Sequence, residues 1–206
     1  MKNFEIKNES GRSMIEMLGV LAIIGVLSVG GIAGYSKAMM KYRINKTIEQ
    51  ITLIAGNVRA FFAPQKNYEG LSNTVIKKAK LIPDEMWDGN DIKNVFGYRV
   101  GLVTIIRSTV GDKQAFRISY AIGDNMEPCI ELLSYDWRVS GVQAIAIEGP
   151  ASTDSLKFPV AVDKAVEVCS EAISKNRMYG ESVPDMSFFF DINLNSTYWS
   201  SRTWAN

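Results

Sequence analysis

Glu16 is the residue with the clearest chemical anomaly, because it is an acid inside an apolar stretch near the start of the chain. A charge at the centre of a bilayer costs about 2.5–3.5 kcal/mol on insertion scales, so such an acid is a functional candidate by default. A plainer interpretation is equally open. Ser13 and Glu16 have the S-x-x-E spacing of a capping box, in which each side chain bonds a backbone N–H where a helix starts.

Cys129 and Cys169 are the two cysteines of the chain. In an exported segment, which faces an oxidising compartment, such a pair is most simply a disulfide. The bond would close a loop of about 41 residues and constrain the unfolded chain by about 4 kcal/mol on the entropy model. Two unrelated buried thiols are the alternative, whereas two cysteines without histidine cannot fill a structural zinc site.

The sequence lacks the common motifs of enzymes. The sequence contains no histidine, which removes His-based triads, His metal sites and histidine pH switches. The phosphate-binding patterns G-x-x-x-x-G-K-[ST] and G-x-G-x-x-G are absent as well. The acidic residues Asp84, Glu85, Asp88 and Asp91 do not have EF-hand spacing, so a solvated loop is favoured over a metal site. We therefore expect no enzyme, no cofactor and no metal.

The charge balance argues against nucleic acid as a partner. Lys and Arg total 23 against 22 for Asp and Glu, a formal net charge of +1, so there is no basic surplus to displace counterions. Without a basic groove, Trp87 and Trp137 are expected in a core or an interface. The aromatic tail around Trp199 and Trp204 is a candidate contact surface.

A long N-terminal helix is the element that must position Glu16. From Met17 to Tyr35 the chain runs 19 residues without a charge, and a helix of that length spans about 28 Å, close to the hydrocarbon thickness of a bilayer. Apolar residues then recur at helical spacing: Ile44, Ile48, Ile51, Ala55, Val58 and Phe62. With no proline before Pro64, we predict one helix from about Ser13 to Phe62.

The apolar run leaves some alternatives open. A secretory signal peptide is the competitor, but its apolar region is typically about 7–15 residues and is followed by a small-residue cleavage site. Lysine and arginine flank both ends of the run, so the positive-inside count does not fix its orientation. Its five glycines indicate either close helix packing or a stretch able to bend or unwind: Gly19, Gly25, Gly30, Gly31 and Gly34.

The rest of the chain predicts an α+β domain without βαβ alternation or repeats. Helices are expected from Asn73 or Thr74, as the cap, to Pro83, and at Met126–Ser134 and Asp163–Ile173. Strands are expected at Val100–Ile106, Ala115–Ile122, Val142–Ile147 and Met186–Ile192, the first two forming a hairpin around the turn-like segment Val110–Lys113.

Residues 1–11 form a short polar leader that ends at Gly11, and Glu16 and the apolar run follow it. This arrangement resembles the type IV pilin and pseudopilin superfamily. The resemblance implies that a prepilin peptidase cuts after Gly11 and methylates the new amine of Arg12. It also implies that Glu16, the fifth residue of the mature chain, pairs with a neighbouring subunit's N-terminal amine during assembly. A buried carboxylate is tolerable when an ammonium neutralises it. The sequence departs from the usual pattern in having Arg12 where Phe or Met is common and Ser13 where Thr is common.

Features farther along resemble the type IVb pilins of enteric Gram-negative bacteria: Gly70-Leu71, Ile82-Pro83, Asn94–Gly97, Pro128-Cys129, and Cys169 followed by Phe188–Phe190. The resemblance implies an α+β fold in which a long N-terminal helix packs on an antiparallel β-sheet. It implies a Cys129–Cys169 disulfide bounding the C-terminal region. The implied divisions are a leader (1–11), an apolar assembly half of the helix (12–36), an amphipathic half (37–63) and a globular head (64–206).

The function implied is that of a structural pilin subunit. Its expected partners are copies of itself in a helical filament, the prepilin peptidase, the inner-membrane assembly machinery and, before assembly, the lipid bilayer. Before assembly, we expect a single-pass inner-membrane protein with its head in the periplasm. After assembly, we expect it in an extracellular pilus. A minor pilin or secretion pseudopilin is the alternative within this class, and a membrane-anchored periplasmic enzyme is the alternative outside it. Adhesion, conjugation, DNA uptake, motility and secretion all use this scaffold.

Overall fold

A computed structural model describes residues 10–105, 113–148, 156, 158–179 and 185–191 of the 206. These residues fall into two compact units, Met1–Tyr42 and Arg43–Asn206. Helix α1, Ser10–Phe62, runs through both. It begins three residues before the predicted Ser13 and ends at the predicted Phe62, where a short 3₁₀ turn containing Pro64 follows.

The first unit consists of the N-terminal part of α1. Its described side chains from Met14 to Tyr35 are all exposed, with Val26 at 76%. Among the described residues, one helix is long and apolar enough to cross a membrane, with a mean hydropathy of 2.2 in its most apolar window. A Cβ added at any of the five glycines of this stretch would meet nothing within 4 Å. No contact made by the described chain therefore requires glycine there.

The second unit is built around the C-terminal part of α1. Of the six apolar residues that recur at helical spacing from Ile44 to Phe62, five are buried as predicted and Ile48 is half-buried. We call this set the apolar stripe of α1. The buried face also includes Ile54 and two polar residues, Thr47 and Gln50. The amphipathic pattern thus identified the buried face, although it did not identify the polar residues within it.

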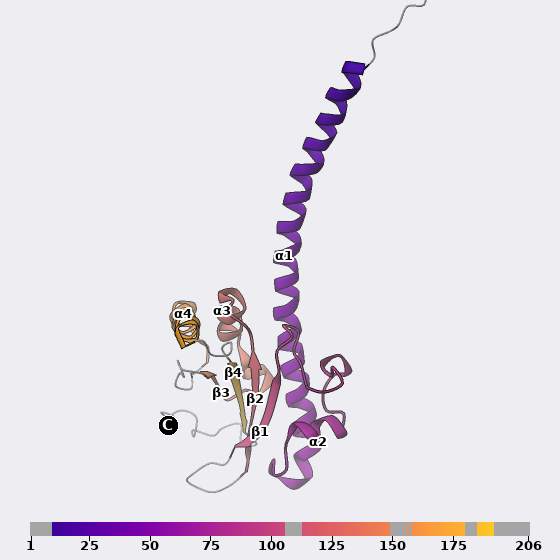
Figure 1. Cartoon of the computed structure of the whole chain (residues 1–206). Helices are drawn as coiled ribbons and strands as arrows, with labels where there is room; N and C mark the ends of the chain where they lie inside the picture. Colours follow the sequence, from indigo (N-terminus) through magenta and orange to yellow (C-terminus); the bar gives the residue numbers. More distant parts are fainter. Residues whose placement is uncertain (1–9, 106–112, 149–155, 157, 180–184, 192–206) are drawn as a thin grey trace, which may run out of the picture. The chain divides into compact units, whose positions relative to one another are not determined.

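A four-stranded antiparallel sheet forms the centre of this unit (Figure 1). Its strands are β1 (Val100–Ile105), β2 (Ala115–Ala121), β3 (Ala144–Glu148) and β4 (Asp185–Asp191), in the order β1-β2-β4-β3. The four predicted strands are therefore confirmed, with shifts of one or two residues at most of their ends. The predicted turn between β1 and β2 lies mainly outside the described residues.

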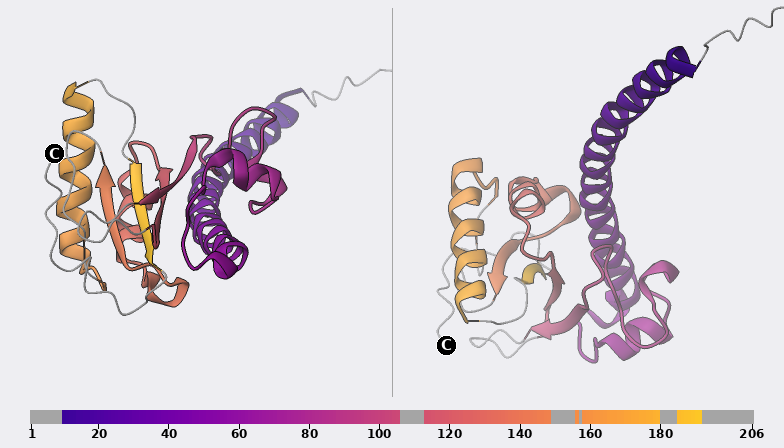
Figure 2. Two further views of the ribbon diagram at one scale, coloured as in Figure 1. Left: turned by 90° about the horizontal axis from the view of Figure 1, so that it is seen from below. Right: turned by 45° about the horizontal axis from the view of Figure 1, so that its top comes forward.

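The α+β fold is confirmed, and the sheet packs on α1. Alternate residues of a strand point to one face, and Phe116 and Tyr120 of β2 share a buried face with Phe190 of β4. Arg59 of α1 lies over the Phe190 ring, with its guanidinium carbon 5.2 Å from the ring centroid. In Figures 1 and 2, helix α4 (Val162–Tyr179) lies on the opposite side of the sheet from this part of α1.

Helix α4 starts one residue before the predicted Asp163 and extends to Tyr179, beyond the predicted end at Ile173, whereas α2 is shorter than predicted. The helix α2 covers Asn73–Lys78 and is capped by Ser72, whose side chain accepts a hydrogen bond from the Val75 N–H, rather than by Asn73 or Thr74. It ends before Pro83, since Lys80 has already turned to a φ of 52°. Helix α3 covers Met126–Ser134 as predicted, and short 3₁₀ turns cover Asp84–Met86 and Trp137–Ser140.

A run of aromatic contacts joins α1 to the sheet. Phe62, Tyr68, Phe116 and Phe190 form successive pairs with ring centroids 4.6–5.8 Å apart. Such pairs contribute about 0.5–1.5 kcal/mol each beyond the burial of their area. Trp137 is fully buried, as predicted, and contacts Phe188. The predicted contact surface at Trp199 and Trp204 lies outside the described residues.

Buried hydrogen bonds fix the position of α1 along β2. The Tyr120 hydroxyl donates to Gln50 Oε1 at 2.7 Å and accepts from Thr47 Oγ1 at 3.3 Å. Burial raises the pKa of Tyr120 to about 12, compared with ~10 for an exposed tyrosine. The group therefore contributes stability that is complete below pH ~10 and is lost as the pH rises towards about 12.

Replacing Tyr120 by phenylalanine is expected to lower the free energy of unfolding by about 1–3 kcal/mol near neutral pH, because Gln50 loses a buried partner. Above pH ~10 the difference between the two proteins should shrink, since only the wild type must keep a phenol protonated in the fold. Urea unfolding of the full-length chain in detergent, followed at several pH values, measures both effects. A difference that stays constant with pH would contradict the assigned pKa shift.

Candidate assembly surface

The N-terminal junction is helical from Ser10 onward, so Gly11, Arg12 and Glu16 all lie on the first turns of α1. Ser13 lies inside the helix rather than at its cap, and the capping-box interpretation is therefore wrong for this chain as it stands. Glu16 is exposed, at the start of the apolar stretch. What remains for this acid is the other interpretation, a carboxylate carried on an apolar helical surface.

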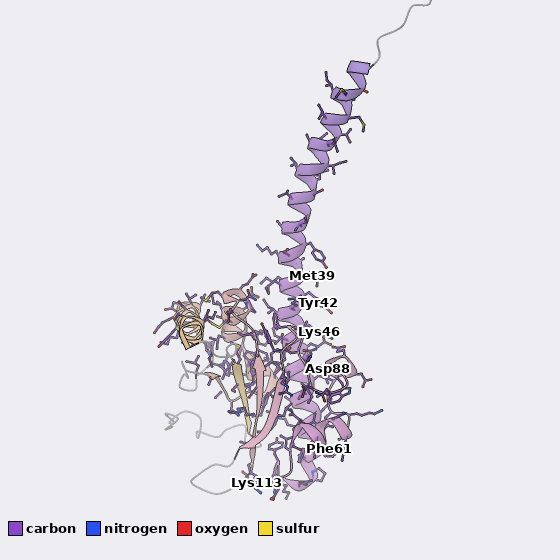
Figure 3. All side chains as sticks on the ribbon, in the orientation of Figure 1. Met39, Tyr42, Lys46, Phe61, Asp88 and Lys113 are labelled. Carbon is purple, nitrogen blue, oxygen red and sulfur yellow. A yellow bond between two sulfur atoms is a disulfide. The ribbon has the colours of Figure 1, made fainter. Side chains whose placement is uncertain are left out.

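This surface is wide and covers all sides of the helix. Figure 3 draws the side chains of α1 before Met39 on more than one side of the helix. Every large apolar side chain of this stretch is at least half exposed: Met14, Ile15, Met17, Leu18, Val20, Leu21, Ile23, Ile24, Val26, Leu27, Val29, Ile32 and Tyr35. Soluble monomers rarely expose a contiguous apolar patch of more than a few hundred Å², and larger ones mark membrane or protein contacts.

Hydrogen bonds connect the second half of α1 to the turn Trp137–Ser140 and to Gly141. The guanidinium of Arg59 donates to the carbonyl oxygens of Ser140 and Gly141, and the Thr52 and Ser140 hydroxyls are 2.9 Å apart. Gly141 has a φ of 74°, and a Cβ there would collide with the Arg59 guanidinium. These contacts, like Thr47 and Gln50, were not found from the sequence, because nothing local distinguishes them from solvated polar residues.

The two cysteines are joined by a disulfide, which confirms the predicted pairing. Cys129 lies on α3 and Cys169 on α4, and both are fully buried where the two helices pack against each other. Residues that share the buried face of α4 recur at helical spacing, from Ala165 through Cys169 to Ile173. The bond therefore covalently links α3 and α4 through two cysteines that are 40 residues apart in sequence.

Three residues of the acidic cluster form ion pairs. Asp88 pairs with Lys93 at 2.7 Å, Asp91 with Arg99 at 2.7 Å, and Glu85 with Lys46 at 2.8 Å. Hydrogen bonds from the backbone N–H of Asp91, the Lys93 ammonium and the backbone N–H of Asn90 hold the pKa of Asp88 well below its usual range. In the described part of the chain, no group of three or more acidic or cysteine side chains is arranged to hold a metal ion.

Comparison with known proteins gives consistent matches. The family model described as Bundlin matches residues 37–181. Two curated proteins, each described as "Major structural subunit of bundle-forming pilus", come from Escherichia coli O127:H6 (strain E2348/69 / EPEC) and Escherichia coli O111:H-. Each is 28% identical to this chain over 93 residues. The alignment covers 44% of this chain and 48% of each relative, so the chain spans about half the length of the curated relatives it matches.

One solved structure is also similar. It is the crystal structure of a type IV b pilin from Salmonella typhi, with a TM-score of 0.47 and 13% sequence identity. The similarity covers 70% of this chain and 97% of that one.

Proposed function

The chain belongs to the bundlin family, and from this premise we propose that it is a structural subunit of a type IVb pilus, within the type IV pilin superfamily. The observation that carries the proposal is the exposed apolar surface of α1, which is present on a chain whose second unit is otherwise well packed. Such a surface needs lipid or other copies of itself to cover it.

The subunit is first held in the inner membrane by the apolar half of α1, with its head in the periplasm. A prepilin peptidase removes residues 1–11, and the methylated amine of Arg12 becomes the N-terminus. Cleavage frees the apolar half, residues 12–36, to leave the bilayer and enter the filament. The amphipathic half, 37–63, joins it to the head, 64–206. The buried stripe and the Arg59 contacts support this division, because they fix the second half of the helix to the sheet.

In the filament, each apolar helix lies among the helices of other copies. Glu16 of one subunit accepts the N-terminal ammonium of its neighbour, which removes the cost of two unpaired charges in an apolar surrounding. Each subunit presents one surface and receives another, and repetition of such a contact generates an open helical fibre. The role is structural, and the inner-membrane assembly machinery extrudes the filament from the cell.

Cleavage is tested by intact-mass analysis of the full-length chain expressed with an active prepilin peptidase. We expect a chain that starts at Arg12 and carries a methylated amine. The variant Gly11→Val should keep its leader, since a branched side chain replaces the glycine at the cut. Ser10→Ala, a matched change one residue away, should be processed normally. An intact leader on the wild type, under conditions in which a known prepilin is cut, would refute the proposal.

A further inference from the structure

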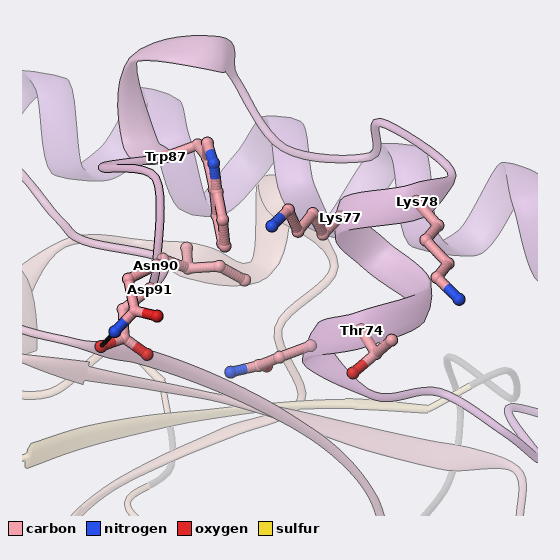
Figure 4. A pocket seen from close by; sticks show the side chains of 8 residues that line it. Thr74, Lys77, Lys78, Trp87, Asn90 and Asp91 are labelled. Carbon is pink, nitrogen blue, oxygen red and sulfur yellow. Dashed lines mark hydrogen bonds between the residues drawn. The ribbon is translucent and has the colours of Figure 1, made fainter.

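Two parts of the second unit differ in how their apolar side chains are covered. In a pocket of about 400 Å³ beside α2 (Figure 4), the Lys77 ammonium lies 3.3 Å from the centroid of the Trp87 ring and covers its face. The turn Trp137–Ser140, in contrast, carries Val139 with 88% of its surface exposed. Among the described residues of the second unit, no other large apolar side chain is more than 61% exposed.

The turn that carries Val139 is fixed by contacts with its surroundings. A single exposed valine is ordinary on a protein surface, but this one does not sit on a loose loop. Trp137 is fully buried, and its indole N–H donates to the Leu132 carbonyl at 2.6 Å. At the other end of the turn, Arg59 of α1 donates to the Ser140 carbonyl at 3.2 Å. Val139 is thus held in one position, and little ordering is needed for it to enter a contact.

An exposed face of α1 lies beside this turn, because the Ser140 and Thr52 hydroxyls are 2.9 Å apart. The exposed residues of this face recur at helical spacing, and we call them the open face of α1: Asn45, Glu49, Thr52, Gly56 and Ala60. The one charged member, Glu49, is paired with Lys46 at 3.2 Å. The open face therefore carries no charge that lacks a partner.

Gly56 lowers the stability of the helix without serving a contact of the described chain. Glycine is less favourable than alanine in a helix interior, and a Cβ at Gly56 would meet nothing within 4 Å. Small residues on a helix let the backbone of another helix approach closely. Ala60 lies four residues further along the same face. The open face therefore suits a second helix that packs along it.

We propose that the open face and Val139 receive the apolar half of α1 from a second copy of the chain. The inference rests on the proposed function and adds the place on one subunit where another's apolar helix lies. That helix fits because it has no charge from Met17 to Tyr35 and exposes apolar side chains on all sides. The open face also belongs to the same unbroken helix as the apolar half, so the contact continues the assembly surface.

Helix α4 of a second copy suits the open face less well. It exposes Val162 at 61%, but the exposed Asp163 is the next residue. Burying that carboxylate without a cation would be costly. The open face contains no cation, and the nearby Lys46 is already paired with Glu49 and Glu85.

Two variants test the contact without disturbing the single chain. Val139→Asp places a carboxylate at a largely exposed site, and Gly56→Leu fills open space with a better helix former. The urea midpoint of each dispersed full-length chain should equal or exceed that of the wild type. The yield of sheared filaments should fall at least about tenfold, because the contact would bury an unpaired charge or exclude the neighbouring helix. Val139→Ile and Gly56→Ala, the matched controls, should assemble.

Photo-crosslinking identifies the occupant. A benzophenone amino acid replaces Val139 in a minority of subunits that are co-expressed with the wild type, and sheared filaments are irradiated. We expect a dimer-sized product from filaments and none from the chain dispersed in detergent. The peptide joined from the other copy should fall within residues 14–35. A joined peptide from α4 or another part of the head, or a product with a different protein, would overturn the inference.

Full filament yield from Val139→Asp or from Gly56→Leu would also contradict the inference, while the proposed function would stand. A wild-type chain that never polymerises would instead refute the proposed function, and the inference would fall with it.

Discussion

Replacing Glu16 by alanine is expected to abolish filament formation while the second unit, from Arg43 onward, stays folded. Loss of one partner of a buried ion pair costs about 3–5 kcal/mol, because the other charge is left buried alone. Every subunit contact in the filament would bear this cost. The yield of filaments sheared from cells that express the assembly machinery measures the effect, and the urea midpoint of the dispersed chain reports on the fold.

Two further variants separate charge from packing. Glu16→Gln keeps the shape of the side chain and removes its charge, so it should be nearly as defective as alanine. Ser28→Ala also removes a polar group from the apolar half, but this hydroxyl is satisfied within its own helix by the carbonyl of Ile24 at 2.7 Å. It should assemble normally. Wild-type filament yield from Glu16→Gln would eliminate the proposed pairing with an N-terminal ammonium.

Removing the disulfide is expected to lower the free energy of unfolding strongly. The bond joins residues 40 apart, and opening a loop of that length costs about 4 kcal/mol on the entropy model. Many domains have only about 5–15 kcal/mol in total. Joint replacement of Cys129 and Cys169 by alanine should therefore lower the urea midpoint strongly and expose α3 and α4 to proteolysis.

Reduction provides the control for this prediction. A reductant should lower the midpoint of the wild type to nearly that of the double-alanine variant, and it should not affect the variant itself. Both cysteines are fully buried, so part of the variant's loss will come from the cavities left by the two sulfur atoms. If the midpoint of the wild type is the same with and without reductant, the disulfide does not contribute to stability as proposed.

Local periodicity was enough to predict most elements of the fold. The apolar residues of α1 up to Phe62 and those of the strands each face one buried side. The spacing of apolar residues therefore predicts these elements. Helix caps were less predictable, because Ser72, Asn73 and Thr74 are consecutive and all can cap a helix. The choice depends on tertiary contacts, since β1 engages the side chain of Asn73 and leaves Ser72 as the cap.

Sheet order could not be predicted in this way. The last strand, β4, lies between β2 and β3. The sequence of β4 does not predict which strands it pairs with. Its position depends on long-range packing, such as the stacking of Phe116 on Phe190 with ring centroids 4.7 Å apart. The same limit applies to the polar network around Tyr120, whose members are about 70 residues apart along the chain.

In the candidate assembly surface, the key residue could be found from the sequence but its partner could not. Glu16 was identified from sequence because an acid in an apolar run is locally anomalous, whereas its proposed partner is the amine of another copy. A single chain therefore shows only one side of the proposed contact, an exposed apolar surface with an acid near its start.

The central claim is that other copies of the chain cover the apolar half of α1, and thiol protection tests it most directly. Both native cysteines are in the disulfide, so Val26→Cys introduces a unique thiol at a site that is 76% exposed in the single chain. In sheared filaments this thiol should react with a maleimide only after detergent disperses them, whereas Lys66→Cys should react in both states. Equal reactivity of the Val26→Cys thiol before and after dispersal, or a chain found only in the membrane with no filaments to shear, would contradict the account.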